Sequence, residues 1–478
     1  MDTRVTTSSI TSPLLGTLLA LAVAGCAVGP EYKRPDVAPA KEFRSQVGPS
    51  EAVSFADLPW WEVFHDKALQ GLISEGLANS YDLKITVARI DEAAAQVGIV
   101  RADLYPQIGY QALAARQKSF VPLQLPQNLT YNTFGLAASA AWELDVWGRI
   151  RHASDAAKAN LFAQEDVRRA VMLTLVSEIA AGYFTLIELD RELAIAQESV
   201  DTYRRTLDLF SQRFEAGRDS KLGVVRAQAN YEASTASLAA LKRAITQQEN
   251  ALCVLIGAYP HAVARGTALT EQTTPTTPVG LTTDLLERRP DILQAEQVMI
   301  GANAEVGVAV ANYFPRIGLS ALFGWESTRP EDLFKSNFNI WQIGANLTGP
   351  IFQGGRLKSA YQAQQAFWDE SISQYKKTIT VAFQETSDAL VAQQTLVGQR
   401  DAQQRQVAAL RESVDLALQR YDGGRATYFE VLEAEQQLFP SQDALAQTQR
   451  DQLIAVVNLY KALGGGWNLK DAEWATPH

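Results

Sequence analysis

The chain has 478 residues, with 53 acidic and 43 basic side chains, so its formal charge at pH 7 is -10. An acidic chain lacks the basic face that phosphate recognition needs, which argues against nucleic acid as a partner. Hydrophobic residues make up 47% of the chain and charged residues 20%, and no apolar run reaches the ~18 residues of a spanning helix. Disordered chains and multi-span helical membrane proteins are therefore excluded.

The first predicted element, residues 1–25, has the layout of a secretory signal peptide. A single Arg4 precedes the apolar run Leu14–Val23, and the small residues Ala24 and Gly25 lead directly to Cys26. Since the apolar run stops at the cysteine, we expect Cys26 to be the lipidated first residue of the mature chain, carrying diacylglycerol and palmitate. The alternative is an ordinary signal peptide with an incidental cysteine. No other cofactor and no metal are expected.

The rest of the chain repeats itself. RFEAGRDSKLGVVRAQANYE, from Arg213, matches RYDGGRATYFEVLEAEQQLF, from Arg420, at an offset of 207 residues, and YPQIG from Tyr105 matches FPRIG from Phe314 at an offset of 209. We therefore predict two structural repeats. The expected parts are a lipidated extended segment at 26–55, repeat 1 at 56–257, a Thr/Pro-rich linker at 258–281, repeat 2 at 282–464 and a tail at 465–478.

Each repeat contains two stretches with the period of a β-strand. In PRIGLSALFGWE, Ile317, Leu319 and Phe323 fall on one face, while Arg316 and Ser320 fall on the other. Stretches of this length with apolar and polar faces and aromatic ends suit transmembrane strands, although a soluble sheet with one wet face has the same pattern. The four strands are expected at about 106–116, 134–145, 315–326 and 338–349.

Long helices are predicted after the strands of each repeat. Residues 127–259 contain no proline, and apolar residues step by three and four from Leu186 to Phe214, which is a heptad seam. The seam predicts long helical hairpins at about 152–256 and 357–463, which reverse direction at glycines. Pro440 interrupts the returning helix of repeat 2, where we expect a kink.

Four strands are too few for one chain to close a barrel, because about eight is the practical minimum. An open sheet edge cannot face lipid, since its backbone groups would lack hydrogen-bond partners. The chain should therefore oligomerise. A dimer would supply eight strands and a filled interior, and a trimer would supply twelve strands with room for a passage.

The sequence resembles the outer-membrane factor family of efflux ducts, in its lipoprotein branch. The resemblance is carried by CAVGPEYKRP from Cys26, DLKITVARI from Asp82, WELDVWGR from Trp142 and LLERRPDI from Leu285. It implies a membrane α+β fold. In that fold, a homotrimer forms a twelve-stranded transmembrane β-barrel, four strands per chain, which continues into a long periplasmic α-helical coiled-coil barrel.

The resemblance also implies a function, partners and a location. The expected function is that of the outer-membrane exit duct of a tripartite efflux system, with no enzymatic activity. The implied partners are a periplasmic adaptor (membrane fusion) protein, an inner-membrane pump of the RND type and outer-membrane lipid. The chain would be lipid-anchored in the cell outer membrane with a periplasmic extension. Two alternatives are the outer-membrane component of a type I protein secretion system and a lipid-tethered periplasmic coiled-coil scaffold.

A gate is implied where the hairpin of repeat 2 reverses, in YDGGRATYFEVLEAEQ. The family's acidic constriction residues fall here on Glu430 and Glu433, three residues apart on one helical face. Phe429 falls at an apolar constriction position. Tyr421 falls where a tyrosine helps to latch the closed state.

Three copies of the two glutamates would bring six carboxylates together, which bound cations, raised pKa values or a nearby arginine would relieve. Arg226 and Arg425 are the candidate partners. Such a ring would favour cations. The alternative is that Glu430 and Glu433 are solvated residues of a helix face.

Overall fold

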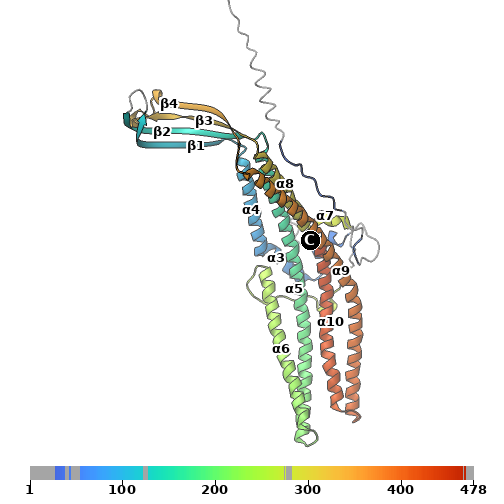
Figure 1. The fold of residues 1–478 in the computed structure, drawn as a ribbon. Coiled ribbons are helices and arrows are strands. Elements are labelled where there is room, and N and C mark those ends of the chain that lie inside the picture. The colour runs from blue at the N-terminus through green and yellow to red at the C-terminus, as the bar shows by residue number, and fades with distance from the viewer. Residues whose placement is uncertain are drawn as a thin grey trace, which may run out of the picture. The chain divides into compact units, whose positions relative to one another are not determined.

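The structure is a computed structural model, and it describes residues 27–37, 42–44, 54–121, 127–273, 275, 282–466 and 468–469 (Figure 1). Cys26 and the signal segment 1–25 lie outside the described residues. The chain divides into two compact units. Unit 1 holds the described residues up to Asp36 together with Arg89–Glu165 and Gln294–Tyr375, and unit 2 holds Val37–Ala88, Asp166–Leu293 and the chain from Lys376 onward.

Unit 1 contains one antiparallel sheet with the strand order β1-β2-β3-β4. Its register aligns Tyr110 with Ala138, Ala138 with Phe323 and Phe323 with Trp341, so one row crosses all four strands on the same face. The aromatic members of this row are exposed, Tyr110 to 86% and Trp341 to 71%. The sheet therefore presents an apolar face with no cover from the described part of its own chain. The strands are β1 (Gln107–Val121), β2 (Gln127–Leu144), β3 (Arg316–Ser327) and β4 (Asn339–Thr348).

The expected number of strands is confirmed, but the first two strands are longer than the sequence predicted. β1 runs to Val121 and β2 begins at Gln127, and the two remain paired to their outer ends through Val121 and Gln127. The predicted end of the first strand at about residue 116 was therefore wrong, because residues 117–121 also belong to β1. The backbone ladder does not require alternating side chains, so it continues past the point at which the sequence pattern fades.

The chain that follows Cys26 lies along the helices of unit 1. The Val28 N–H donates to the Trp147 carbonyl over 3.1 Å, and the Asn303 side-chain amide donates to the Pro30 carbonyl over 3.2 Å. Arg34 then forms an ion pair with Glu296 over 2.9 Å. The contacts of Pro30 and Arg34 hold this segment against the helix that carries Glu296 and Asn303.

Four long helices form the two hairpins of the described chain. They are α5 (Arg149–Glu215), α6 (Lys221–Leu255), α9 (Arg356–Asp422) and α10 (Tyr428–Ala462). Within the described chain, α5 is the one helix long and apolar enough to cross a membrane, but 61% of that apolar window is buried inside the fold, as in a core helix. The shorter helices are α2 (Trp60–Val63), α3 (Lys67–Asn79), α4 (Tyr81–Ala102), α7 (Leu285–Arg288) and α8 (Pro290–Ala311).

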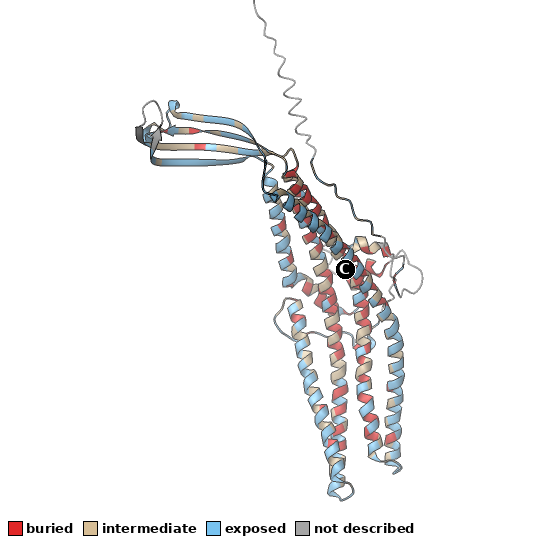
Figure 2. Cartoon of the chain, viewed as in Figure 1, coloured by how far each residue is buried: buried red, intermediate tan, exposed pale blue. Residues whose placement is uncertain are grey.

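The core of unit 2 is formed by the middle of α5 and the carboxyl-terminal parts of α6 and α10. Trp60, Ile179, Tyr183, Leu252 and Tyr460 are fully buried there. Figure 2 shows most buried residues on the helices, whereas the sheet of unit 1 is coloured mainly as exposed and intermediate. Burial of such side chains stabilises a fold by roughly 1.5–3 kcal/mol each, so unit 2 holds most of the hydrophobic stabilisation that one chain can make alone.

Cys253 and the linker complete this core. The Cys253 side chain is fully buried, with its Sγ 2.9 Å from His261 Nδ1, and the linker beyond it is tied to α3. The Asp66 carboxylate caps α3 at the Ala68 N–H over 2.9 Å. The same carboxylate accepts hydrogen bonds from the Tyr183 hydroxyl over 3.0 Å and the Thr267 N–H over 2.8 Å.

The two repeats are visible as matched helices. α4 and α8 each have 22 residues, α5 and α9 each have 67, and α6 and α10 each have 35. Equivalent glycines end the repeats: a Cβ on Gly257 would meet the Asn79 carbonyl, and one on Gly464 would meet the Arg288 carbonyl. The internal repetition is thus structural. α10 continues on both sides of Pro440, and the expected kink there stays a prediction.

Candidate functional site

The two hairpins of unit 2 reverse direction in the same way. Gly217 and Gly424 have φ angles of 69° and 68°, which glycine adopts without strain. Beyond them the Arg218 N–H donates to the Arg213 carbonyl, and the Arg425 N–H donates to the Arg420 carbonyl, both over 2.8 Å. These bonds close the last helical turn as in a Schellman motif. Both turns lie where the sequence placed them.

Tyr421 lies where the two hairpins meet. Its ring packs edge-on against Tyr428 with 5.0 Å between centroids, and the Arg213 guanidinium lies 5.0 Å from the Tyr421 centroid. Tyr428 in turn packs against Phe210 at 5.3 Å, and its hydroxyl is hydrogen-bonded to Thr206. The position predicted as a latch therefore belongs to an aromatic cluster that joins the α9/α10 hairpin to α5.

Within one protomer, the predicted gate glutamates do not contact the arginines that were expected to neutralise them. The Glu430 carboxylate forms an ion pair with Arg420 over 3.5 Å, and Arg226 lies over the Phe429 ring at 5.8 Å. Within the described protomer, neither Arg226 nor Arg425 forms an ion pair with Glu430 or Glu433.

The exposure of these residues matters for the proposed site. Phe429 is 56% exposed, and Glu433 and Arg425 are also exposed. Their side chains are thus available to a neighbouring copy or to solvent.

A cavity of about 400 Å³ separates the two hairpins beside this cluster. Arg213, Arg226, Tyr421, Phe429 and Leu222 are among the residues that line it. Aromatic rings and guanidinium groups therefore share one wall, and both can rearrange by side-chain rotation without unfolding either hairpin.

Gly223 explains why repeat 1 cannot carry the same acidic residue. It is the counterpart of Glu430, 207 residues earlier. A Cβ on Gly223 would lie 2.7 Å from the Phe210 ring, so any larger side chain would displace that ring from Tyr428. Only repeat 2 has room for a carboxylate at this position.

Sequence reasoning missed a set of buried carboxyl groups behind the cluster. Glu435 on α10 is only 5% exposed, and one of its carboxylate oxygens has no hydrogen-bond partner in the described chain. Burial raises the pKa of Glu435 to about 7, and Arg205 lowers it only in part.

Two other carboxyl groups, Asp443 on α10 and Glu188 on α5, behave similarly. Burial raises the pKa of Asp443 to about 6, with Glu192 adding to the rise. Burial also raises the pKa of Glu188, and Arg450, 3.4 Å away, offsets only part of it.

The signal that marks Glu435 is its place in a buried stripe. Val431, Leu432, Leu438 and Phe439 on the same helix are all buried, and Glu435 falls between them at helical spacing. A glutamate within such an apolar stripe can be predicted from the sequence alone to be buried.

Taken together, a four-stranded sheet with an exposed apolar face and two long helical hairpins define a protomer of a membrane duct. A sequence model of the outer membrane efflux protein family matches residues 72–258 and 281–465, once for each repeat. The chain belongs to this family.

Known proteins agree with this assignment. The chain is 34% identical over 466 residues to the toluene efflux pump outer membrane protein TtgC of Pseudomonas putida, covering 94% of this chain and 96% of that protein. It is 31% identical over 456 residues to the cation efflux system protein CusC of Escherichia coli, covering 95% and 99%. It also matches the open-state structure of the MtrE outer membrane channel of Neisseria gonorrhoeae, with a TM-score of 0.82, 30% identity and coverage of 92% and 99%.

Family membership confirms the expected fold class and location. The chain has four strands and two repeats of long helices, which is the protomer of a trimeric outer-membrane channel with a periplasmic helical extension. It is an efflux duct of the outer membrane. The family is one of efflux channels.

Proposed function

We propose that this chain is the passive exit duct of a tripartite efflux system, gated at the tips of its helical hairpins. Three copies supply the twelve strands of one barrel, because β1 and β4 end the described sheet on either side and one chain cannot close it. Cys26 carries the acyl chains that hold the amino terminus in the outer membrane. The ordered contacts of Val28, Pro30 and Arg34 support an anchor directly before them.

The partners follow from the same proposal. A duct needs a source of energy elsewhere, so an inner-membrane pump of the RND type and a periplasmic adaptor protein complete the path. The names of the relatives support a duct that does not choose its cargo. TtgC is named for toluene and CusC for cations, although both are similar to this chain over more than 90% of its length. Cargo selection then belongs to the pump.

The gate consists of Glu430 and Glu433, with Phe429 as an apolar constriction and Tyr421 as a latch. The single observation that carries this proposal is the aromatic cluster of Tyr421, which joins the α9/α10 hairpin to α5. Moving the hairpin that holds the two glutamates requires breaking this cluster. In a trimer, six carboxylates at one axis attract cations, and Arg420 is the neutralising partner within each protomer.

The experiment is planar-bilayer conductance of the purified full-length trimer. The double variant Glu430→Ala/Glu433→Ala should raise single-channel conductance severalfold and reduce the preference for cations over anions, since six charges leave the constriction. The matched control is Glu412→Ala/Asp415→Ala, which removes two exposed carboxylates of α9 that are also three residues apart. Unchanged conductance and selectivity in the first variant, or equal changes in both variants, would refute the gate.

A further inference from the structure

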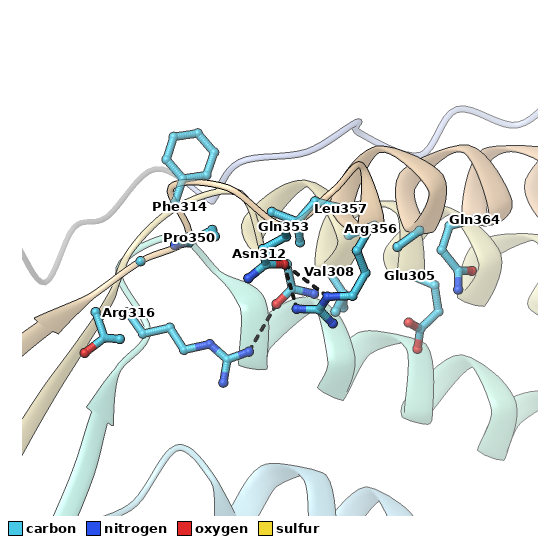
Figure 3. Close-up of a pocket in the computed structure, with 14 residues that line it drawn as sticks. Glu305, Val308, Asn312, Phe314, Arg316, Pro350, Gln353, Arg356, Leu357 and Gln364 are labelled. Carbon is cyan, nitrogen blue, oxygen red and sulfur yellow. Dashed lines mark hydrogen bonds between the residues drawn. The ribbon is translucent and has the colours of Figure 1, made fainter.

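A second polar cavity lies within unit 1, at the base of β3 and β4. Its volume is about 600 Å³, and it is bounded by α8, by the start of α9 and by the segments that join these helices to the strands. Figure 3 shows polar side chains directed into it from both helices and from the strand. The polar residues that line it are Glu305, Asn312, Arg316, Gln353, Arg356 and Gln364.

Two guanidinium groups in this cavity bind mainly neutral amides. Arg356 donates from Nε over 3.1 Å and from an Nη over 2.7 Å to the Gln353 side-chain oxygen. Arg316 donates to the Asn312 side-chain oxygen over 3.3 Å, and the nearest carboxylate to it, Glu143, is 4.0 Å away. Figure 3 shows the two arginines on either side of these amides. Each guanidinium has five N–H donors, so most of their capacity to bind an anion is unused by the described chain.

The internal repeat provides a comparison for this cavity. A neighbouring cavity of about 500 Å³ is lined in part by four residues of repeat 1: Asp103, Gln107, Glu143 and Arg149. They lie 209 or 207 residues before Asn312, Arg316, Pro350 and Arg356, which line the first cavity. Arg316 and Thr348 of repeat 2 line both cavities, and the four matched positions differ in charge.

In repeat 1 the arginine already has an internal anion. Glu143 binds Arg149 with both carboxylate oxygens, each over 3.0 Å. Asp145 accepts hydrogen bonds from the N–H groups of Ile150 and Arg151, at the start of α5, both over 2.9 Å. Carboxylates thus neutralise both the guanidinium and the positive end of the helix dipole.

Repeat 2 keeps the cation and loses these anions. Pro350 stands at the position of Glu143, Phe352 at that of Asp145, and Asn312 at that of Asp103. A second arginine, Arg316, replaces Gln107. The carboxylate that binds Arg149 in repeat 1 has no counterpart among the side chains that line the cavity of repeat 2. The comparison indicates that an external anion takes its place.

The register of the sheet places Arg316 on its polar face. Arg316 pairs with Thr348, and the next position on that face pairs Gly318 with Asn346 on β4 and with Glu143 on β2. In outer-membrane barrels the polar face of each strand lines the lumen. An anion in the duct can therefore reach Arg316 without crossing lipid.

We propose that this cavity is a binding site for a phosphate-type oxyanion, held between Arg316 and Arg356. The start of α9 at Arg356 places the positive end of the helix dipole at the same end of the cavity. Glu305 is the one carboxylate among the lining residues, and burial raises its pKa, which weakens its repulsion of an anion. The proposal goes beyond the duct function and does not depend on the gate.

The oxyanion has two possible sources, which the experiment separates. It is either a free anion in the duct or the headgroup of a phospholipid from the adjacent leaflet. The full-length trimer is purified in a detergent without phosphate. Calorimetric titration then uses inorganic phosphate in one arm and dihexanoylphosphatidylcholine, below its micellar concentration, in the other.

Wild-type protein should bind the probe, and Arg356→Gln and Arg316→Gln should each weaken binding about tenfold or more, as expected for loss of a charge-assisted hydrogen bond. Asn312→Asp restores the acid of repeat 1 and should also weaken it. Lys358→Gln, an exposed cation on the same helix that does not line the cavity, is the matched control and should bind like wild type. Trimer migration on unheated gels verifies that each variant is folded.

Binding of inorganic phosphate supports the site and assigns it to a free anion. Binding of the lipid analogue alone, lost in Arg356→Gln, supports the site and assigns it to a headgroup. If neither probe binds the wild-type trimer, or if both arginine variants bind like Lys358→Gln, the site does not exist.

Discussion

Repeat 1 and repeat 2 have matched helices but opposite chemistry at two places. At the base of the sheet, Glu143 of repeat 1 binds an arginine, whereas repeat 2 has Pro350 at that position. At the hairpin tip the carboxylate belongs to repeat 2, where Glu430 stands, while repeat 1 has Gly223 packed beneath Phe210. At each of these two matched positions, the duplicated backbone thus carries a carboxylate in only one copy.

This difference between the repeats separates residues that the backbone conformation requires from residues that can differ between the two copies. Glycines that reverse the chain, such as Gly217 and Gly424, occur in both copies. The carboxylates Glu143 and Glu430 do not. Because both copies fold within one chain, each can serve as the control for the other.

The largest expected effect comes from Gly257→Ala at the end of repeat 1. Gly257 has a φ of 74°, and a Cβ there would lie 2.5 Å from the Asn79 carbonyl oxygen. Its counterpart Gly464 has a φ of 73°, but the nearest carbonyl oxygen would be 3.1 Å away. Both alanines cost about 1–2 kcal/mol for the left-handed backbone, and only Gly257→Ala adds a backbone clash, for a total on the order of 3 kcal/mol or more.

The measurement is the temperature at which the trimer dissociates on gels. Gly71→Ala in α3 is the control, because a Cβ there would meet nothing within 4 Å, and it should be neutral or slightly stabilising. The expected order of stability is Gly71→Ala, then Gly464→Ala, then Gly257→Ala. A Gly257→Ala trimer as stable as the Gly464→Ala trimer would contradict the prediction, because it would show that the added Cβ causes no extra clash at Gly257.

The next effect concerns Glu435→Gln, which gives repeat 2 the residue that repeat 1 has at Gln228. The folded-state pKa of Glu435 is raised from 4.5 to about 7, so folding favours the protonated form. Stability is therefore fully present below about pH 4.5 and falls as the pH rises through 7. The shift corresponds to at most about 3 kcal/mol, and the glutamine variant should recover much of it at pH 8 and nothing at pH 4.5.

Dissociation temperatures across this pH range test the prediction. Some pH dependence will remain in the variant, because burial also raises the pKa of Asp443 and of Glu188. Glu412→Gln, which neutralises an exposed glutamate of α9 outside the gate, is the control and should follow the wild-type profile. Identical profiles for wild type and Glu435→Gln would mean that Glu435 ionises freely in the folded trimer.

Much of the fold was predictable because an internal duplication places matching residues at a nearly constant offset in the sequence. Offsets of 207 and 209 residues predicted the repeats, and helices of equal length confirm them. The alternation of apolar and polar residues predicted four strands, since each strand has one apolar face that suits lipid. The outer ends of β1 and β2 were not predictable in the same way, because backbone pairing continues there without a side-chain pattern.

The candidate site was only partly predictable. Tyr421 ends a heptad seam, and the structure places it in an aromatic cluster. The Arg420–Glu430 pair was missed because it bridges a turn between residues ten apart, where no helical spacing applies. Glu435 was missed because most helical glutamates are solvated, and only its buried neighbours on α10 distinguish it.

The smallest expected effects separate two equivalent arginines, Arg213 and Arg420, which are 207 residues apart. Arg420 pairs with Glu430 over 3.5 Å, but their side chains are 59% and 42% exposed, so Arg420→Gln should cost less than about 0.5 kcal/mol. Arg213 lies over the Tyr421 ring, and Arg213→Gln should cost about 0.5–1 kcal/mol. Dissociation temperatures at low and high salt measure both, and only the Arg420 effect should fade with salt.

A double-mutant cycle identifies where the Arg213 effect comes from. If Arg213 acts through the ring of Tyr421, Arg213→Gln should add nothing once Tyr421→Leu has removed that ring, whereas Arg420→Gln should have the same small effect in both backgrounds. Equal effects of Arg213→Gln with and without the Tyr421 ring would show that Arg213 does not act through that ring. The aromatic cluster would then hold the two hairpins together through its rings alone. Neither Arg213 nor Arg420 would contribute to the stability of the latch.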